Sequence, residues 1–262
     1  MSSYGRVVDD NEILRLFKET SEAVHGAISA VKDWRPMTDR PSQYAIDLVA
    51  DKAALGVLIK SGVGVLSEES GLHKPLDPKL GLTVVVDPID GSTNASRGIP
   101  WYATSLCALD DSGPRAAFVI NQATGERFEA LRGGGAQANG LAISSSSCSE
   151  FDQAIVGMSG MPDRHLGWRQ FRVLGAAALD MCAVACGRLD AYFDTSNGIH
   201  GPWDYLGAML ICQEAGAVVG DSGGRELVVV EHEVRRAPVA AATQELFEQL
   251  ISLIKPQRLK ES

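Results

Sequence analysis

The sequence predicts a mixed α/β (α+β) protein, with helices packed on both faces of β-sheets. Three observations support this fold class. The chain has 262 residues, 45% hydrophobic and 22% charged, which suffices for one large core or two modest ones. Amphipathic helical patterns and β-branched runs both occur along the chain. Beyond a glycine- and serine-rich stretch near residue 140, short strands and helices alternate, and layers of helices on sheets bury both economically.

The first half of the chain begins with two helical patterns. Residues 10–34 carry apolar side chains at three-to-four spacing, and Asp10 is available as the N-cap. The second pattern stops at Ser61-Gly62, where glycine favours the end of a helix. Strands are expected at residues 63–66, 82–86, 104–109 and 116–120, and the last two indicate an antiparallel sheet.

The second half is expected to form its own domain, so the predicted domains are residues 1–140 and 141–262. Its predicted strands are 154–157, 171–174, 189–193, 218–220, 227–230 and 239–241. Its predicted helices are 176–185, 203–215 and 244–254, the last capped by Thr243 and ended by Pro256.

Charge and hydropathy exclude several classes of function. The formal net charge is −9, so neither nucleic acid nor a membrane surface is an expected partner. No apolar run reaches the roughly 18 residues of a membrane span. The N-terminal residues place acids where a signal peptide needs a basic and then an apolar segment, so a cytoplasmic location is expected. The 5 cysteines lack a C-x-x-C pair, which predicts reduced, buried thiols.

Residues 87–94 combine two carboxylates, a glycine and hydroxyl groups directly after a buried strand. Pro88 fixes φ after the first acid, and Gly91 allows the backbone to approach a ligand closely. If a helix begins near Ser92, its free N–H groups would bind a phosphoryl oxygen. The segment therefore predicts a tight turn that holds a hard cation and a phosphate together. The structural alternative is that Asp90 or Ser92 is only a helix N-cap.

Further acids lie at the ends of predicted elements. Glu68-Glu69 follow a strand, Asp204 follows Pro202-Trp203 at a helix start, and Asp51 lies near another helix start. Solvated surface for Glu68-Glu69, and helix capping for Asp204 and Asp51, are the structural alternatives. If these acids converge, their carboxylates repel one another, and a divalent cation is their natural partner.

Other ligand-binding motifs are absent or incomplete in the sequence. Val86 and Pro88 fall at EF-hand positions that need oxygen ligands, so residues 87–94 are not a calcium loop of that kind. The histidines lack H-x-x-x-H spacing, which disfavours zinc. The sequence contains neither a phosphate-binding P-loop nor a G-x-S-x-G motif.

Together the acidic motifs resemble the magnesium-dependent, lithium-sensitive phosphatases of the inositol monophosphatase family. The signatures are Ser67-Glu68-Glu69-Ser70, residues 87–94, and residues 203–208 leading into Glu214-Ala215-Gly216. Supporting matches are residues 175–179, Asp190-Ala191-Tyr192, and Gly135-Ala136 with Asn139-Gly140. The matches follow the family's order over most of the chain. The resemblance implies the family fold, a layered α/β/α/β/α sandwich of the sugar-phosphatase type.

The resemblance also implies roles for individual residues. The implied metal ligands, for two or three Mg²⁺ ions per active site, are the carboxylates of Glu68, Asp87, Asp90 and Asp204 and the main-chain carbonyl of Ile89. The implied catalytic residues are Glu68 and the pair Asp51 and Ser92, which would orient and activate the attacking water. The implied substrate-binding residues are Asp90, Gly91, Ser92, Thr93 and Ala177.

The implied activity is Mg²⁺-dependent hydrolysis of inositol monophosphate or a related small sugar or polyol phosphate. The reaction would be direct attack of a metal-activated water on phosphorus. Alternatives are fructose-1,6-bisphosphate, histidinol phosphate or 3′-phosphoadenosine phosphate as substrate. A further alternative is a catalytically silent protein that binds a metal or a sugar phosphate. Because homodimers are common in the family, a homodimer is expected.

Three departures from the family pattern concern the attacking water and the substrate. Leu48 stands where the family usually has threonine, and the polar residues near it are Tyr44 and Asp47. Ser196-Asn197 stand where inositol-specific members tend to offer a glutamate. Ser92 replaces the commoner threonine and keeps its hydroxyl. None of these departures removes an implied metal ligand.

Overall fold

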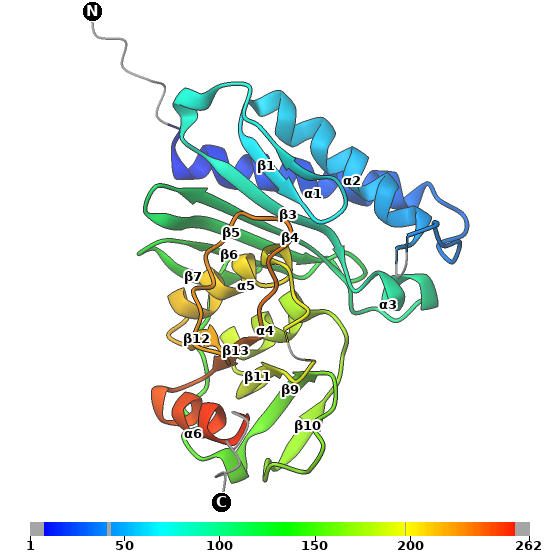
Figure 1. Ribbon diagram of the computed structural model, residues 1–262. Coiled ribbons are helices and arrows are strands. Elements are labelled where there is room, and N and C mark those ends of the chain that lie inside the picture. Colours follow the sequence, from blue (N-terminus) through cyan, green and yellow to red (C-terminus); the bar gives the residue numbers. More distant parts are fainter. Residues whose placement is uncertain (1–7, 41–42, 197, 255–262) are drawn as a thin grey trace, which may run out of the picture.

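Helices and sheets alternate in five layers in the computed structural model, which describes residues 8–40, 43–196 and 198–254 (Figure 1). Two helices, α1 and α2, cover one face of the first sheet. The next pair, α4 and α5, lies between the two sheets, and α6 covers the far face of the second sheet. This order confirms the predicted α/β/α/β/α sandwich. The helices are α1 (Asp10–Ser29), α2 (Ala45–Leu58), α3 (Ser92–Arg97), α4 (Ala177–Ala185), α5 (Pro202–Glu214) and α6 (Gln244–Ile254).

The first sheet contains one parallel pair, β1 with β3, among antiparallel neighbours, in the order β2-β1-β3-β4-β5-β6-β7-β8. Side chains along β3 alternate between its two faces. Val84 and Val86 pack beneath α1 and α2, whereas Val85 packs toward α4 and α5. Both faces are buried, which explains the β-branched run in the sequence. The strands are β1 (Gly64–Ser67), β2 (Gly71–His73), β3 (Thr83–Asp90), β4 (Ala103–Asp110), β5 (Gly113–Asn121), β6 (Arg127–Leu131), β7 (Gly135–Ala138) and β8 (Leu141–Ala142).

The second sheet has the order β10-β9-β11-β13-β12. Its first three strands are parallel, and β13 is antiparallel to both of its neighbours. The chain passes from the first sheet to the second just after residue 140, and α4 and α5 join both sheets in one core. The division into two domains at residue 140 stays a prediction. The strands are β9 (Ile155–Ser159), β10 (Gln170–Arg172), β11 (Ala191–Asp194), β12 (Val218–Asp221) and β13 (Pro238–Ala241).

Two predicted elements are wrong in detail. Helix α1 ends at Ser29 rather than residue 34, and its N-cap is Asp9 rather than Asp10. The apolar spacing in the sequence extends past the end of the helix, because Val31 packs on the core although it lies beyond α1. Residues 227–230 form no strand, because the segment runs outside both sheets. The carbonyl of Leu227 instead accepts a hydrogen bond from the Tyr205 hydroxyl at 2.8 Å.

Several smaller expectations can also be compared with the structure. Thr243 Oγ1 accepts a hydrogen bond from the Leu246 amide at 3.2 Å, so it caps α6 as predicted, while Pro256 lies outside the described residues. All the cysteines are free thiols; Cys107, Cys182 and Cys212 are buried, and Cys148 and Cys186 are half-buried. Among the described helices, none combines the length and the apolar character that crossing a membrane requires.

The middle layer gives a test of the core. Leu206 in α5 is 0% exposed, and Leu206→Ala is expected to lower the free energy of unfolding by about 2–5 kcal/mol, because it leaves a cavity between the sheets. Leu76 is 70% exposed and supplies the matched control, for which we expect a change within about 0.5 kcal/mol. Urea unfolding measures the free energy of unfolding of both variants. Equal losses of stability in Leu206→Ala and Leu76→Ala would contradict the packing of α5 in the core between the sheets.

Candidate active site

Asp87 and Asp90 reach one site through an irregularity in β3. Side chains of a regular strand alternate between faces, so residues three apart would point in opposite directions. The pairing of β3 with β4 shifts register between Asp87 and Asp90, which marks a β-bulge. The predicted tight turn is therefore wrong for these two acids, which lie in the strand with Ile89 inside the bulge. The chain turns only at Gly91, and α3 begins at Ser92, as expected.

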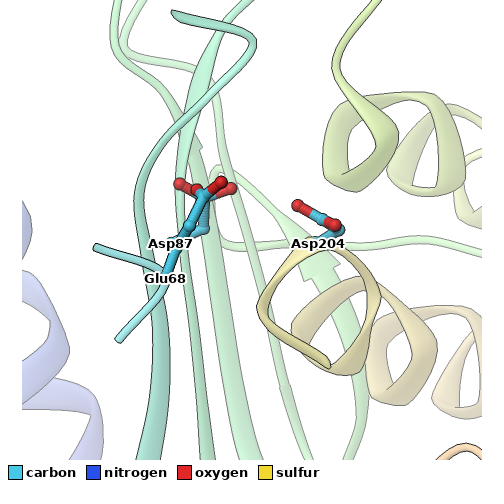
Figure 2. A group of neighbouring side chains, drawn as sticks. All are labelled: Glu68, Asp87 and Asp204. Carbon is cyan, nitrogen blue, oxygen red and sulfur yellow. The ribbon is translucent and has the colours of Figure 1, made fainter. Parts of the chain in front are cut away.

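Glu68, Asp87 and Asp204 bring their carboxylates together from three separate elements. One oxygen of each lies within 4.8 Å of the others. Glu68 directly follows β1, and its amide donates a hydrogen bond to the Val86 carbonyl at 3.3 Å, so it lies beside Asp87 at the carboxyl ends of two parallel strands. Asp204 faces both from the first turn of α5 (Figure 2). The structure thus brings together acids from both halves of the sequence.

Each of three acids is oriented by one backbone N–H group. Asp204 Oδ2 accepts a hydrogen bond from the Gly201 amide at 2.7 Å, so the capping alternative is also true for this residue. The Ile89 amide donates to Asp87 Oδ1 at 2.9 Å, and the Ala178 amide donates to Asp90 Oδ2 at 2.7 Å. A carboxylate has about four lone-pair positions, so each acid keeps acceptor capacity for a ligand.

Ionising this cluster without a cation is unfavourable. Burial raises the pKa of Glu68, Asp87 and Asp90 well above the ordinary range, and repulsion from neighbouring carboxylates raises it further. His200 contacts the cluster, with Nδ1 3.4 Å from Asp204 Oδ2. Burial alone would lower the pKa of His200, but its hydrogen bond and attraction to Asp204 raise it overall. One imidazolium cannot balance these acids, and an all-oxygen donor set suits a hard divalent cation.

The turn after the bulge has little free space. Gly91 has φ of +86°, and a Cβ there would lie 3.0 Å from Ala176 Cβ and 3.1 Å from the carbonyl oxygens of Gly175 and Trp101. A side chain would therefore be strained by both conformation and contact. Ala177 follows Ala176 as the first residue of α4, which places it next to the turn.

Two polar side chains support the loops around this turn. Asn94 Nδ2 donates hydrogen bonds to the carbonyls of Trp101 at 2.8 Å and Leu174 at 2.7 Å, so it ties two separate loops to α3. Asp180 Oδ1 accepts a hydrogen bond from Trp101 Nε1 at 2.8 Å. Burial raises the pKa of Asp180 to about 7. Neither residue had a predicted role, because such loop contacts leave no periodic pattern in the sequence.

Asp51 lies in α2 with its carboxylate already engaged. Its Oδ1 accepts hydrogen bonds from the hydroxyls of Ser67 at 2.5 Å and Ser70 at 3.2 Å. These contacts connect α2 to the segment that carries Glu68. The predicted role of Asp51 as partner of Ser92 in water activation stays a prediction.

Asp47, one helical turn before Asp51, interacts with Ser92. Its Oδ2 accepts a hydrogen bond from the Tyr44 amide at 2.8 Å, while its buried Oδ1 has no hydrogen-bond partner within residues 8–40, 43–196 and 198–254. Burial raises the pKa of Asp47 to about 7, although the Ser92 hydroxyl lies near enough to lower it partly. Sequence reasoning assigned no role to Asp47. The i, i+4 spacing of the two acids was the signal that could have found it.

Tyr44 and Thr93 meet on the outer side of the same turn. The Tyr44 hydroxyl donates a hydrogen bond to Thr93 Oγ1 at 3.5 Å. Hydrogen bonds to Ser96 and then Thr93 lower the pKa of Tyr44.

Ser196 lies beside Gly160. A Cβ atom placed on Gly160 would lie 2.5 Å from Ser196 Oγ, and Asn197 lies outside the described residues.

Comparison with known proteins gives a consistent result. The sequence pattern of the inositol monophosphatase family matches residues 42–258. A protein of Archaeoglobus fulgidus named fructose-1,6-bisphosphatase/inositol-1-monophosphatase is 34% identical over 260 residues, which cover 95% of this chain and 100% of the relative. Nus factor SuhB of Salmonella typhimurium is 31% identical over 210 residues, covering 72% and 76%. A solved inositol monophosphatase-fructose 1,6 bisphosphatase superposes with a TM-score of 0.78 at 28% identity, covering 94% of this chain and 100% of the other.

The raised pKa of Asp87 predicts how the metal-free protein responds to pH. The folded state binds this proton more tightly than the unfolded state, so the stability it contributes is present below the ordinary carboxyl pKa and is lost as pH rises. Asp87→Asn removes this dependence. We therefore compare the free energies of unfolding of Asp87→Asn and the wild type in a chelator. As pH rises, the value for Asp87→Asn minus that for the wild type should increase by up to about 1.4 kcal/mol per pH unit, because one proton is involved.

Urea unfolding from about pH 5 to about pH 8 measures the difference. Asp111 is exposed, and Asp111→Asn serves as the control that should follow the wild type at every pH. A constant difference between Asp87→Asn and the wild type would show that Asp87 ionises normally in the fold.

Proposed function

The chain belongs to the inositol monophosphatase family, and from this premise we propose that it is a Mg²⁺-dependent phosphomonoesterase of inositol monophosphate or a related small sugar or polyol phosphate. The observation that carries the proposal is the convergence of Glu68, Asp87 and Asp204 within 4.8 Å. A catalytically silent protein would have no chemical need for such a costly cluster. A metal-dependent phosphatase would use the cluster to hold the cation that polarises the phosphoryl group.

The residues of the cluster fit a divalent cation. They offer oxygen atoms only, Asp87 is buried while Glu68 and Asp204 are half-buried, and His200 is the cationic partner of Asp204 among the described residues. Glu68, Asp87 and Asp204 would hold one Mg²⁺, and Asp90 with the carbonyl of Ile89 would complete the sites for a second or third ion. When bound, Mg²⁺ polarises a phosphoryl group and favours deprotonation of water.

The chain's own groups would bind and orient the reactants. The amides of Gly91 and Ser92 lie at the N-terminus of α3 and would hold phosphoryl oxygens, with Thr93 beside them. Ala177 would line the pocket for the sugar or polyol. Asp47 would accept the proton of the attacking water, since its buried Oδ1 has no hydrogen-bond partner in the described structure and its carboxyl group interacts with Ser92. The pKa of about 7 at Asp47 suits proton acceptance near neutral pH.

One further substrate follows from the name of a relative. Because a relative is named for both fructose-1,6-bisphosphatase and inositol-1-monophosphatase, fructose-1,6-bisphosphate is the second candidate substrate. Ser196 in place of the family's glutamate supports a relaxed choice of substrate, since the charged acceptor for a hydroxyl is missing. Lithium sensitivity and a homodimer stay predictions from the resemblance, and a cytoplasmic location stays a prediction from the N-terminal sequence.

Substitutions separate water positioning from metal binding. Asp47→Asn and Ser92→Ala should lower kcat by ~10²-fold or more, with little change in the Mg²⁺ concentration that gives half-maximal rate. Asp204→Asn should instead raise that concentration and abolish most turnover, because a neutral amide replaces an anionic ligand.

Asp51→Asn is the matched comparison on the same helix face. If Asp51 rather than Asp47 partners Ser92, Asp51→Asn will cause the larger loss of kcat and Asp47→Asn will remain active. Melting temperatures of all variants show whether a loss of rate reflects a loss of folded protein.

A panel of phosphomonoesters tests the substrate. Hydrolysis should require Mg²⁺ and stop in EDTA, and inositol phosphate and fructose-1,6-bisphosphate should both be cleaved. A preference of ~10⁴ or more for inositol phosphate over all other sugar and polyol phosphates would contradict the relaxed choice. Full turnover in EDTA would contradict the metal dependence itself.

A further inference from the structure

A segment of the second half crosses to the first sheet, and its turn contacts the loop that carries Glu68. Residues 222–237, which we name the crossing segment, connect β12 to β13 (Figure 1, orange). Instead of a tight hairpin, the chain leaves the second sheet, and residues 228–231 line one pocket together with Thr83 of β3 and Leu109 of β4. At its turn, His232 contacts the loop after β1, 164 positions earlier in the sequence.

His232 makes one polar and one ring contact there. Its Nε2 lies 2.8 Å from the main-chain carbonyl oxygen of Glu68, which can only accept, so Nε2 carries the donating hydrogen. Its ring lies against the indole of Trp203, with centroids 4.9 Å apart and 34° between the planes. Trp203 directly precedes Asp204. One side chain therefore touches both segments that present candidate ligands from opposite halves of the chain.

The backbone of Glu68 needs such support. Glu68 lies in the short turn between β1 and β2, and its carboxylate is repelled by Asp204 and neighbouring acids. The amide of Glu68 donates a hydrogen bond to the Val86 carbonyl. The carbonyl oxygen of Glu68 accepts the hydrogen bond from His232. A ligand whose backbone is held at both polar groups loses less freedom when a cation binds.

We infer that His232 is a positioning residue for the metal site: its Nε2–H holds the Glu68 peptide and its ring abuts Trp203, so that Glu68 and Asp204 stay placed for one cation. The inference rests on the proposed function, because it concerns the same site. His232 is not itself a ligand, since Nε2 is engaged and Nδ1 lies 3.6 Å from the carboxylate of Glu233, which is 93% exposed.

The crossing segment is itself anchored for this role. Arg235 Nη1 donates hydrogen bonds to the carbonyls of His232 at 2.6 Å and Val234 at 3.0 Å. Its guanidinium lies 5.0 Å from the centroid of the Trp203 ring. These contacts fix the turn of the segment in place over Trp203.

Titration with Mn²⁺ alone, followed by electron paramagnetic resonance of the free ion, tests the inference without turnover. Mn²⁺ suits the same oxygen ligands. His232→Phe keeps an aromatic ring for Trp203 but lacks the donor, and it should bind Mn²⁺ about 10-fold more weakly than the wild type. His232→Gln keeps an N–H donor and should recover most of that affinity. In both variants, kcat at saturating Mg²⁺ should stay near the wild-type value.

His165 supplies the matched control. It also lies against a tryptophan, with its ring centroid 4.3 Å from that of Trp168, and His165→Phe should bind Mn²⁺ like the wild type. Equal Mn²⁺ affinity for His232→Phe and the wild type would overturn the positioning role while leaving the proposed function intact. Equal weakening by His232→Phe and His232→Gln would also overturn the donor role. Failure of the wild type to bind Mn²⁺ would overturn the proposed function and the inference together.

Discussion

Repulsion among buried carboxylates is the constraint on which the rest of this structure depends. Burial raises the pKa values of Glu68, Asp87 and Asp90, and repulsion from neighbouring carboxylates, that of Asp204 among them, raises them further. A fold built for stability alone would separate such groups or pair them with cations. Keeping them together favours the protein only when a divalent cation supplies the missing charge.

Much of the surrounding architecture holds these acids in position. The parallel pair β1 and β3 brings Glu68 next to Asp87, and the β-bulge turns Asp90 to the same side. The middle layer of helices then carries Asp204 to the cluster from the other half of the chain. Backbone amides orient three of the four acids, and the crossing segment supports the fourth through its own peptide. A cation bound at this point would therefore couple the two halves of the molecule.

The sequence predicted most helices and strands and the acidic segments because these depend on local patterns, whereas the order of the five layers came from the family resemblance. The β-branched run of β3 and the helical spacing of α2, α4, α5 and α6 are visible without tertiary information. The bulge between Asp87 and Asp90 was not predicted, because it depends on register with β4. The interaction of Asp47 with Ser92 and the contact of His232 with Glu68 join residues far apart in sequence. No spacing rule reports such contacts, although the helical interval between Asp47 and Asp51 was an available signal.

Proton release on metal binding tests the central claim most directly. Calorimetric titration of Mg²⁺ near pH 7, in two buffers with different ionisation enthalpies, counts the protons that leave the protein as the ion binds. A raised pKa lets a carboxyl group of the metal-free cluster keep its proton to higher pH, and a carboxyl group that becomes a metal ligand releases the proton it holds. We predict saturable Mg²⁺ binding with net proton release, and loss of that release in Asp87→Asn. Binding with no proton release, or release that Asp87→Asn leaves unchanged, would contradict the account.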